Sequence, residues 1–361
     1  MNKIIVSVTN DITTDQRVHK VCSTLMKNNF EVLLIGRKLI NSKDLKREYD
    51  INRFRLLFNN GFLFYAEFNF RLFFFLLLQK KTILLSNDLD TLLPNFLVSK
   101  IQNKKLVYDS HELFSEIPEL VKRPFVKKCW EKLEDFMLPK LQNCYTVCDS
   151  IKNHYNQKYN CDFKTIKNLP TRKTSLQNPN NYNFKNEKII LYQGALNIGR
   201  GLELMIETME YLENCIFIIV GDGDIYEDLK KTVYIKNLNS KVEFLGRKSP
   251  EKLFKITPNA DLGISFEEDL GLNYRYALPN KIFDYIQAEV PILVSDLPEM
   301  KKIVNQYKVG EIIAERSPKF IAKQIEKLLE KDFSNELKSA KSQLVWENQE
   351  EKLLDIFNNL K

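Results

Sequence analysis

The chain has 361 residues, more than one hydrophobic core usually serves, so two domains of about 150 to 180 residues are expected. Its longest apolar run, residues 72–78, is far shorter than the ~20 residues of a membrane-spanning helix, so this run cannot cross a bilayer. The net charge of +7 comes from short basic runs in both halves rather than from one basic, aromatic element, so nucleic acid is not expected as a partner.

Cysteines and histidines show no zinc-site pattern. The six cysteines include no Cys-x-x-Cys pair, and there are three histidines. The opening sequence MNKIIVSVTND is typical of a strand and a polar turn, and it lacks the features of a secretion signal, so a reducing cytoplasm is expected. The excess of positive charge leaves two interpretations open, a lysine-rich soluble surface and attraction to the anionic inner face of the membrane.

The first elements in chain order form a βα unit. Residues 3–9 predict a buried strand, and apolar residues between 18 and 26 repeat at helical spacing. The loop between them carries Asn10, Asp11 and Arg17, hydrogen-bonding side chains where a phosphate-binding loop would carry glycines. This loop is interpreted either as a surface that binds an acceptor or as a purely structural turn.

A strongly aromatic segment at 62–80 predicts a helix or a helix pair, followed by a strand at 82–86. Part of the aromatic face is expected in the core, while the flanking Arg71 and Lys80 leave contact with a membrane surface open. The next loop carries an Asp-x-Asp pattern, Asp88 and Asp90. For this pair, a divalent metal site is the alternative to a structural role in one βα turn.

His111 follows the carboxyl end of a strand predicted at 105–109, where open parallel sheets place their ligands. A capping or loop histidine is the other interpretation. A helix is predicted over 121–140, and its apolar stripe indicates core packing through Phe125, Cys129, Leu133 and Phe136.

The first half is expected to end with a strand at 144–148 and a helix from 149. A stretch rich in Asn, Pro, Thr and Ser then predicts a linker near 168–187.

The second half restarts with a strand at 188–192 and a glycine-rich loop that contains Arg200. Glycine lets backbone N–H groups approach a phosphate, and a guanidinium group binds two phosphate oxygens at once. The loop could therefore hold a phosphate, although such βα turns are also common without a ligand; its glycines are Gly194, Gly199 and Gly201. A later strand, at 241–246, ends beside Arg247.

Residues 261–299 read as strand, polar loop, short helix and strand. The helix is predicted to begin near Leu278 or Pro279, and its free N–H groups would attract an anion. Lys281 in the first turn is unfavourable there unless a negative ligand is bound, and Asp284 follows one turn later. Arg200 and Lys281 are both expected outside the core. Beyond this unit, helices are predicted over 318–329 and 336–360, the second with a docking face around Trp346.

Three segments, YDSHELF, GALNIGRGLE and LPNKIFDY, resemble in their order and spacing the retaining enzymes of glycosyltransferase family 4. The resemblance implies an α/β fold of the GT-B type, two Rossmann-like doubly wound parallel-sheet domains facing a cleft. Residues 1–168 would be the acceptor-side domain and 188–335 the nucleotide-sugar donor domain. A C-terminal helix at about 336–361 would cross back to the first domain.

The resemblance also implies site roles. His111, Arg200, Lys281 and Glu268 are expected to be catalytic. Donor contacts are expected from Gly194, Gly199, Gly201, Arg247, Asn280, Asp284 and Glu267, and acceptor contacts from Asn10, Asp11 and Arg17. The family usually has Glu, seven residues, Glu. Here Asp284 replaces the second Glu, and Tyr276 stands where the first would be, so Glu267 or Glu268 would fill that role if 269–276 is an insertion.

The predicted function is transfer of a sugar from a nucleotide diphosphate sugar to a glycan or lipid-linked acceptor in cell-surface polysaccharide or glycoconjugate synthesis, with retention of configuration. Neither a cofactor nor a metal is expected. Two alternatives stay open. A nucleotide-sugar epimerase of the same fold would need no acceptor, and a non-catalytic nucleotide-sugar or glycan-binding protein would fit the missing first Glu.

Overall fold

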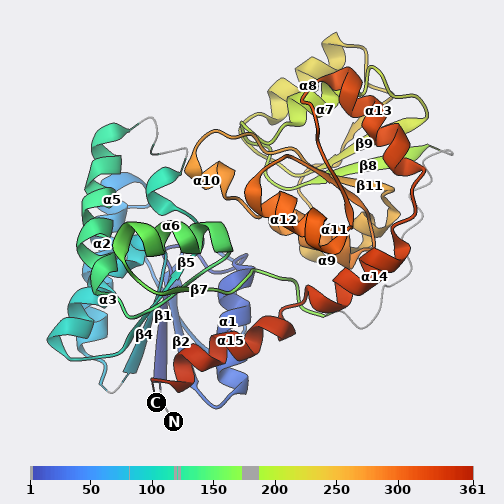
Figure 1. Cartoon of the computed structure of the whole chain (residues 1–361). Helices are drawn as coiled ribbons and strands as arrows, with labels where there is room; N and C mark the ends of the chain where they lie inside the picture. The colour runs from blue at the N-terminus through green and yellow to red at the C-terminus, as the bar shows by residue number, and fades with distance from the viewer. Residues whose placement is uncertain (1–2, 81, 118–119, 121–122, 173–186, 361) are drawn as a thin grey trace. The chain divides into compact units, whose positions relative to one another are not determined.

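The computed structural model describes residues 3–80, 82–117, 120, 123–172 and 187–360. The chain divides into two compact units, Met1–Asn168 with Gln349–Lys361, and Leu169–Asn348 (Figure 1). Most of the linker expected over 168–187 lies outside the described residues. Each unit is considered by itself below.

Unit 1 is built on a seven-stranded parallel sheet in the order β3-β2-β1-β4-β5-β6-β7. Its central strands are buried along their length, as apolar runs of this kind require when helices cover both faces. The strands are β1 Lys3–Ser7, β2 Glu31–Arg37, β3 Asp50–Phe54, β4 Thr82–Asn87, β5 Leu106–Ser110, β6 Asn143–Thr146 and β7 Phe163–Thr165. The expectation that the strand at 144–148 is the last of this half was wrong, because the three-residue β7 pairs with β6.

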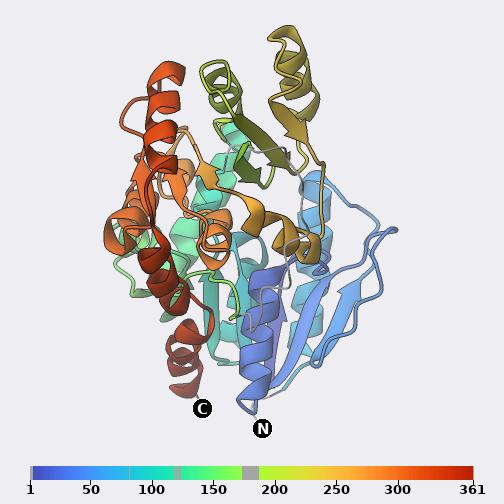
Figure 2. The same ribbon diagram turned by 90° about the vertical axis from the view of Figure 1, so that its right-hand side faces the viewer.

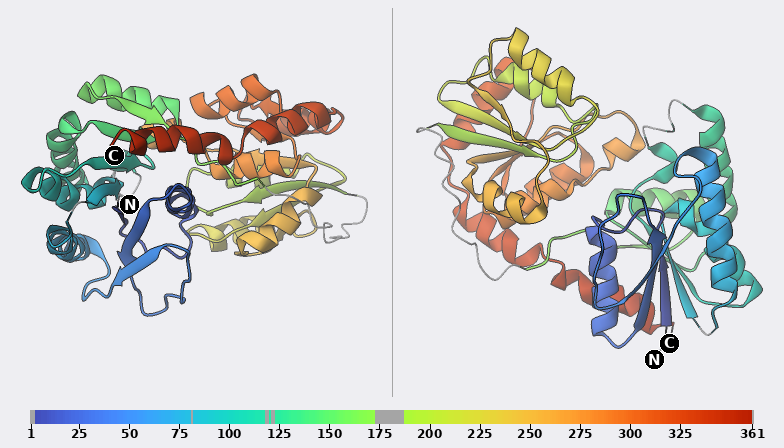
Figure 3. Two further views of the ribbon diagram at one scale, coloured as in Figure 1. Left: turned by 90° about the horizontal axis from the view of Figure 1, so that it is seen from below. Right: turned by 180° about the vertical axis from the view of Figure 1, so that it is seen from behind.

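The helices of unit 1 cover both faces of this sheet (Figure 3). They are α1 Gln16–Lys27, α2 Gly61–Leu77, α3 Leu89–Ile101, η1 Phe114–Glu116, α5 Pro124–Met137, η2 Leu138–Lys140 and α6 Asp149–Tyr159. Asp15 caps α1 by accepting from the Val18 N–H, and Phe64, Phe68, Leu72 and Leu76 form the buried face of α2.

The apolar stripe predicted as the core face of α5 was misassigned. Phe125 is 79% exposed and Phe136 is 52% exposed, whereas Glu134 and Met137 are the buried residues of this helix. Trp130 packs edge-on against Tyr65, with 5.3 Å between ring centroids. The buried face of α5 is therefore rotated about the helix axis relative to the predicted stripe, whose Phe125 and Phe136 are exposed.

Unit 2 contains a six-stranded parallel sheet in the order β10-β9-β8-β11-β12-β13. The strands are β8 Lys188–Gln193, β9 Cys215–Val220, β10 Val242–Phe244, β11 Leu262–Ser265, β12 Ile292–Val294 and β13 Gly310–Ile312. One core cluster lies under α7 Leu202–Thr208, α8 Tyr226–Ile235 and α13 Pro318–Leu329. A second lies under α9 Pro250–Ile256, α11 Asn280–Gln287, α12 Pro298–Tyr307 and α14 Ser334–Gln343. The short helices η3 Thr257–Asn259 and α10 Leu272–Arg275 complete the unit.

The helix expected over 336–361 is two helices. The first, α14, packs on α11 and α12 in unit 2. Between the two helices, Leu344 packs into the second core cluster of unit 2, and the backbone N–H of the buried Trp346 donates to Pro170 O at 2.8 Å. The second, α15 Glu347–Asn358, belongs to unit 1 from Gln349 on. It meets α1, where Thr24 donates to Glu350 at 2.7 Å, and it ends near the start of β1 (Figure 2).

Candidate functional site

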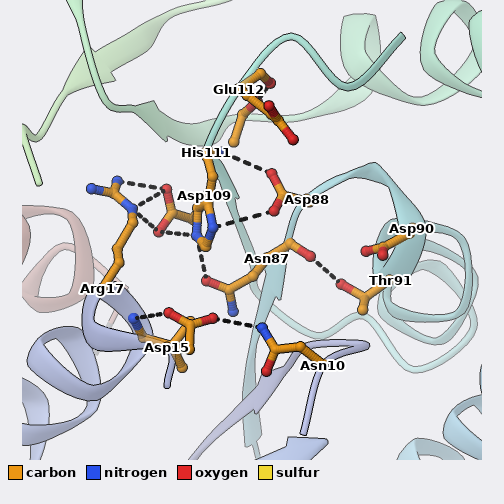
Figure 4. A network of polar contacts seen from close by, with 12 residues as sticks. Asn10, Asp15, Arg17, Asn87, Asp88, Asp90, Thr91, Asp109, His111 and Glu112 are labelled. Carbon is orange, nitrogen blue, oxygen red and sulfur yellow. Dashed lines mark hydrogen bonds and ion pairs between the residues drawn. The ribbon is translucent and has the colours of Figure 1, made fainter. Parts of the chain in front are cut away.

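The polar cluster of unit 1 lies at the carboxyl ends of β4 and β5 and centres on His111 (Figure 4). His111 Nδ1 lies 3.2 Å from Asp88 Oδ2, and Nε2 lies 3.3 Å from Asp109 Oδ2. Nε2 is also 3.3 Å from Asn87 Oδ1, and the His111 backbone N–H donates to Asp88 Oδ1 at 2.8 Å. The imidazole is therefore held between two carboxylates, with both ring nitrogens in polar contact with the protein.

Arg17 of α1 binds Asp109 and so holds one side of this cluster in place. Its guanidinium binds Asp109 through Nε and a terminal nitrogen, the latter at 2.7 Å from Oδ1, and also donates to Ile166 O at 2.9 Å. Arg17 is 3% exposed and Asp109 is fully buried. Arg17, predicted as an acceptor-side residue, thus lies inside the unit and orients Asp109 toward His111.

Burial and charge shift the proton affinities of this cluster. Burial raises the pKa of Asp88 to about 7 against the opposing charge of His111, and it raises the pKa of Asp90 to about 6. Burial disfavours the charged imidazole of His111, yet Asp88 and Asp109 outweigh it and raise the His111 pKa to about 9. His111 is therefore an imidazolium at neutral pH, and Asp88 titrates near neutrality.

The two aspartates of the Asp-x-Asp pattern contact different partners. Asp88 binds His111, while Asp90 accepts a hydrogen bond from the Thr9 hydroxyl. Asp88 has a φ of +57°, in the left-handed region that few non-glycine residues adopt. Among the described residues no group of three or more His, Cys, Asp or Glu side chains is placed to hold a metal ion.

Asn10 and Asp11 bind mainly within their own loop. Asn10 accepts from the Ile12 N–H at 2.8 Å and donates to Asp15 Oδ2 at 2.8 Å. Asp11 accepts from the Thr13 N–H at 3.1 Å and from its hydroxyl at 2.6 Å. Such local bonds are typical of Asn and Asp in tight turns, and they organise the loop ahead of α1.

The polar cluster of unit 2 centres on Glu267, which follows β11 and is fully buried. Lys281 Nζ, in the first turn of α11, lies 2.8 Å from Glu267 Oε1, and Arg200 lies 3.6 Å from the same oxygen. Ser265 donates to Oε2 at 2.7 Å. Burial alone would raise the pKa of Glu267, but Lys281, Ser265 and Arg200 together lower it. Lys281 is 8% exposed, so the expectation that it lies outside the core was wrong.

Arg200 is carried by the glycine-rich loop between β8 and α7. Gly199 and Gly201 adopt φ values of +81° and +69°, and a Cβ on Gly201 would lie 2.3 Å from the Phe266 carbonyl oxygen. Glycine here lets the loop approach the end of β11. The guanidinium lies 5.3 Å from the Tyr274 ring centroid, and its buried Nε has no hydrogen-bond partner in the part of the chain that is described.

Arg316 is a third cation of this cluster that sequence reasoning missed. It follows β13 and donates to Ser295 Oγ at 2.9 Å and to Phe266 O at 3.1 Å. It also lies 3.6 Å from Glu268 Oε1. The structure thereby separates the two candidate glutamates. Glu267 faces Lys281 and Arg200, while Glu268 lies toward Arg316.

The remaining donor-side candidates are more exposed. Asp284, one turn into α11, accepts from Gln193 Nε2 at 3.0 Å, and Gln193 is itself held by Thr257. Asn280 is the exposed first residue of α11, and Pro279 caps the helix without a side-chain hydrogen bond. Arg247 is exposed beyond β10, and Gly194, with φ +142°, directly follows β8.

Comparison with known proteins identifies the fold. Residues 175–344 match the family model described as "Glycosyl transferases group 1". No curated protein matches the chain. Sucrose-phosphate synthase from Thermosynechococcus elongatus superposes with a TM-score of 0.81 at 14% identity, covering 100% of this chain and 99% of that one.

Two further structures agree. HepE from Anabaena, in complex with UDP and glucose, superposes with a TM-score of 0.75 at 12% sequence identity, and both chains are fully covered. WaaG, a glycosyltransferase involved in lipopolysaccharide biosynthesis, superposes with a TM-score of 0.69 at 14% sequence identity, covering 98% of this chain and 99% of that one. The chain therefore has the GT-B fold, as predicted. The family match and this fold together support a place in the GT-B glycosyltransferase superfamily.

Proposed function

We propose that this protein is a glycosyltransferase that moves a sugar from a nucleotide diphosphate sugar to a glycan or lipid-linked acceptor. The observation that carries the proposal is the cluster of Arg200 and Lys281 around Glu267, in the unit that matches the group 1 family model. Finer parts of the proposal are membership of family 4, retention of configuration, a cytoplasmic location and a role in cell-surface polysaccharide or glycoconjugate synthesis.

The unit 2 cluster is suited to bind a diphosphate. Arg200 and Lys281 carry two positive charges against the single charge of Glu267, which leaves an excess for an anion. The uncapped start of α11 adds N–H groups beside Lys281. The unpaired Nε of Arg200 offers a further donor, which a phosphate oxygen would satisfy. These features support assigning the donor diphosphate to this cluster.

Charge development at the leaving group gives the cluster its catalytic role. When the sugar bond to the donor breaks, negative charge grows on the nucleoside diphosphate, and fixed cations stabilise that state more than the ground state. Glu267 would act as a positioning residue, because it holds Lys281 and Arg200 in place. With the charge met by side chains, we propose that the reaction needs no metal.

The nucleoside part of the donor is assigned to neighbouring strand ends. Asp284, oriented by Gln193, would accept hydrogen bonds from the ribose hydroxyls. Arg247 would lie near the base, and Asn280 and Gly194 near the phosphates. The relative HepE has been observed with UDP-glucose, which supports a nucleotide-sugar donor for this chain also.

In unit 1 we propose that His111 contacts the transferred sugar as an imidazolium. Both ring nitrogens already face protein oxygens, so a sugar hydroxyl would replace one of the longer contacts, such as Asn87 at 3.3 Å. Asp109, held by Arg17, keeps the ring oriented while that exchange occurs. Asn10 and Asp11 remain candidates for the acceptor side.

A thermal-shift screen of nucleotide diphosphate sugars tests the proposal, since a donor at ~100 times its dissociation constant adds ~2.7 kcal/mol to stability. Release of nucleoside diphosphate with the best donor would then show turnover, and activity should persist in excess chelator. Interconversion of the donor without any acceptor would favour an epimerase. Stabilisation without any release of nucleoside diphosphate would favour a non-catalytic binding protein.

A further inference from the structure

Three helices of unit 1 form one connected layer, α2, α3 and α5 (Figures 1 and 3). Asn69 of α2 donates to Asp90 O of α3 at 2.9 Å, and Phe96 of α3 packs against Phe136 of α5 with 5.8 Å between ring centroids. Tyr65 and Trp130 join α2 to α5. The layer covers one face of the sheet, so the side chains that point away from the sheet form its outer surface.

This outer surface is unusually apolar. Of the 19 large apolar side chains that are exposed among the described residues, nine lie on these three helices and a tenth, Leu78, directly follows α2. They include Phe62 (82% exposed), Phe70 (65%), Phe74 (49%), Leu78 (80%), Ile101 (64%) and Phe125 (79%). Soluble proteins rarely expose so many large apolar groups together, and such patches mark contact surfaces.

Helix α2 is apolar on its exposed side as well as on its buried side. Phe64, Phe68, Leu72 and Leu76 face the core, and the opposite side presents Leu63, Ala66, Phe70 and Phe74 to the exterior. A helix that is apolar on both sides is normally covered on both sides. The core covers only one side of α2, so the other side requires a second apolar environment.

Cations lie on the same helices as these apolar groups. Arg71, Lys100, Lys128, Lys132 and Lys140 are all exposed on the same helices or directly after them. Lys140 Nζ lies 3.3 Å from the Phe136 ring centroid, and no carboxylate among the described residues pairs with Lys128 or Lys132. Lysine can bury its aliphatic stem and place its ammonium at a headgroup phosphate. Exposed apolar side chains interspersed with lysines along the same helices are the pattern of an interfacial membrane surface.

We propose that the outer face of α2, α3 and α5 binds the surface of a bilayer that contains anionic lipids. No described helix is long and apolar enough to span a membrane, so the contact would be peripheral. The aromatic side chains would enter the interface, and the lysines would meet anionic headgroups. The inference rests on the proposed function only for its purpose, access to a lipid-linked acceptor; the binding itself is independent of the donor site.

The test is sedimentation of the full chain with vesicles of phosphatidylcholine alone and of phosphatidylcholine mixed with phosphatidylglycerol. Phe70→Gln with Phe74→Gln should weaken binding to the mixed vesicles about tenfold or more. Lys128→Glu with Lys132→Glu should weaken binding to the mixed vesicles by at least about 25-fold, the effect of losing two positive charges, and leave binding to neutral vesicles unaffected.

Matched controls come from unit 2. Tyr234→Gln with Ile235→Gln removes two large side chains from α8 that are more exposed than Phe70 and Phe74. Lys323→Glu with Lys327→Glu makes the same charge change as the lysine variant, on α13. Both should bind vesicles like the wild type. Thermal shift with the donor should be normal in all four variants, which separates this inference from the donor assignment.

Three results would overturn the proposal: no sedimentation of the wild type with either vesicle, wild-type binding by the Phe70/Phe74 variant, or loss of binding in the unit 2 controls to the same degree. A dimer in sedimentation equilibrium that dissociates in the Phe70/Phe74 variant, without vesicle binding, would assign the surface to a second copy of the chain instead.

Discussion

Glu267 of unit 2 and Asp88 of unit 1 are both carboxylates just beyond a parallel strand, yet their pKa values move in opposite directions. Burial would raise both. At Glu267, the positive charges of Lys281 and Arg200 outweigh burial and lower the pKa. At Asp88, the negative charges of Asp90 and Glu112 add to the effect of burial. The single imidazolium of His111 does not overcome them, so the pKa of Asp88 stays raised. The comparison shows that the neighbouring charges, rather than burial, decide which carboxylate stays ionised.

This difference separates the chemistry of the two clusters. In the unit 2 cluster the pKa of Glu267 is held below its usual value, so this carboxylate stays ionised through the physiological range. The unit 1 cluster changes its protonation between about pH 7 and 9, because Asp88 and His111 titrate there. We expect removal of a charge to act on binding and stability in unit 2, and on pH dependence in unit 1.

The largest effect is expected from Lys281→Ala. It leaves Glu267 as a buried carboxylate without its closest cation, which typically costs about 3 to 5 kcal/mol of unfolding free energy. Trp346 reports on unit 2 once Trp130 is replaced by Phe, since the chain has two tryptophans, one in each unit. Urea unfolding followed by Trp346 fluorescence is the measurement.

Two controls sharpen that result. Lys301→Ala breaks an exposed pair with Asp296 and should cost less than about 1 kcal/mol. Adding Glu267→Gln to Lys281→Ala should restore part of the lost stability, because the uncompensated charge is removed. Equal stabilities of Lys281→Ala and the wild type would show that Glu267 does not depend on Lys281.

Arg200→Ala is the cleaner test of the diphosphate assignment, because Arg200 is more exposed than Lys281 and lies further from Glu267. Losing one electrostatic contact to a leaving group typically raises the barrier by ~3 kcal/mol, about a hundredfold in turnover. Nucleoside diphosphate release at saturating substrates measures it. Lys331→Ala removes another positive charge of the same unit and should not change turnover. Wild-type turnover in Arg200→Ala would remove Arg200 from the site.

How far the sequence predicts these clusters depends on where their partners lie. The strand ends and the glycine loop were visible because apolar runs and glycines are local signals, so the parallel α/β units followed from them. The GT-B fold was implied by the resemblance to glycosyltransferase family 4. Arg316 was not visible because its partners are Ser295 and a carbonyl at Phe266, which only the folded sheet brings together. The burial of Lys281 likewise depends on Glu267, fourteen positions away.

Asp284→Asn tests the ribose assignment within the unit 2 cluster. A carboxylate that accepts from two hydroxyls makes charge-assisted hydrogen bonds worth ~1.5 to 3 kcal/mol, so the dissociation constant of the nucleoside diphosphate should rise about ten- to hundredfold. Calorimetric titration into the folded variant is the measurement. Asp296→Asn makes the same change at another exposed site of unit 2 and should bind normally. Equal affinities of Asp284→Asn and the wild type for the nucleoside diphosphate would exclude Asp284 from the donor site.

The smallest expected effect concerns His111 and is a change with pH. Because the pKa of His111 is raised to about 9, its contribution to stability is fully present below the unfolded value of about 6.5 and is lost as the pH rises through 9. Unit 1 should therefore lose on the order of 1 to 2 kcal/mol between pH 7 and 9, the partial exposure of the ring reducing the full effect. The contribution of Asp88 to the stability of unit 1 also falls as the pH rises, but mainly between about pH 4 and 7, outside this window.

Urea unfolding of unit 1, followed by Trp130 in a Trp346→Phe background, measures this loss. His111→Gln combined with Asp88→Asn should remove most of it; Asp88 is replaced as well because the imidazolium lowers its pKa, which would otherwise rise into this window. His154 is the matched control in the same unit. Burial lowers its pKa, so its contribution falls at acid rather than alkaline pH, and His154→Gln should keep the alkaline loss. If this double variant retained the alkaline loss in full, His111 would not be an imidazolium held between Asp88 and Asp109, and unit 1 would contain a neutral histidine instead.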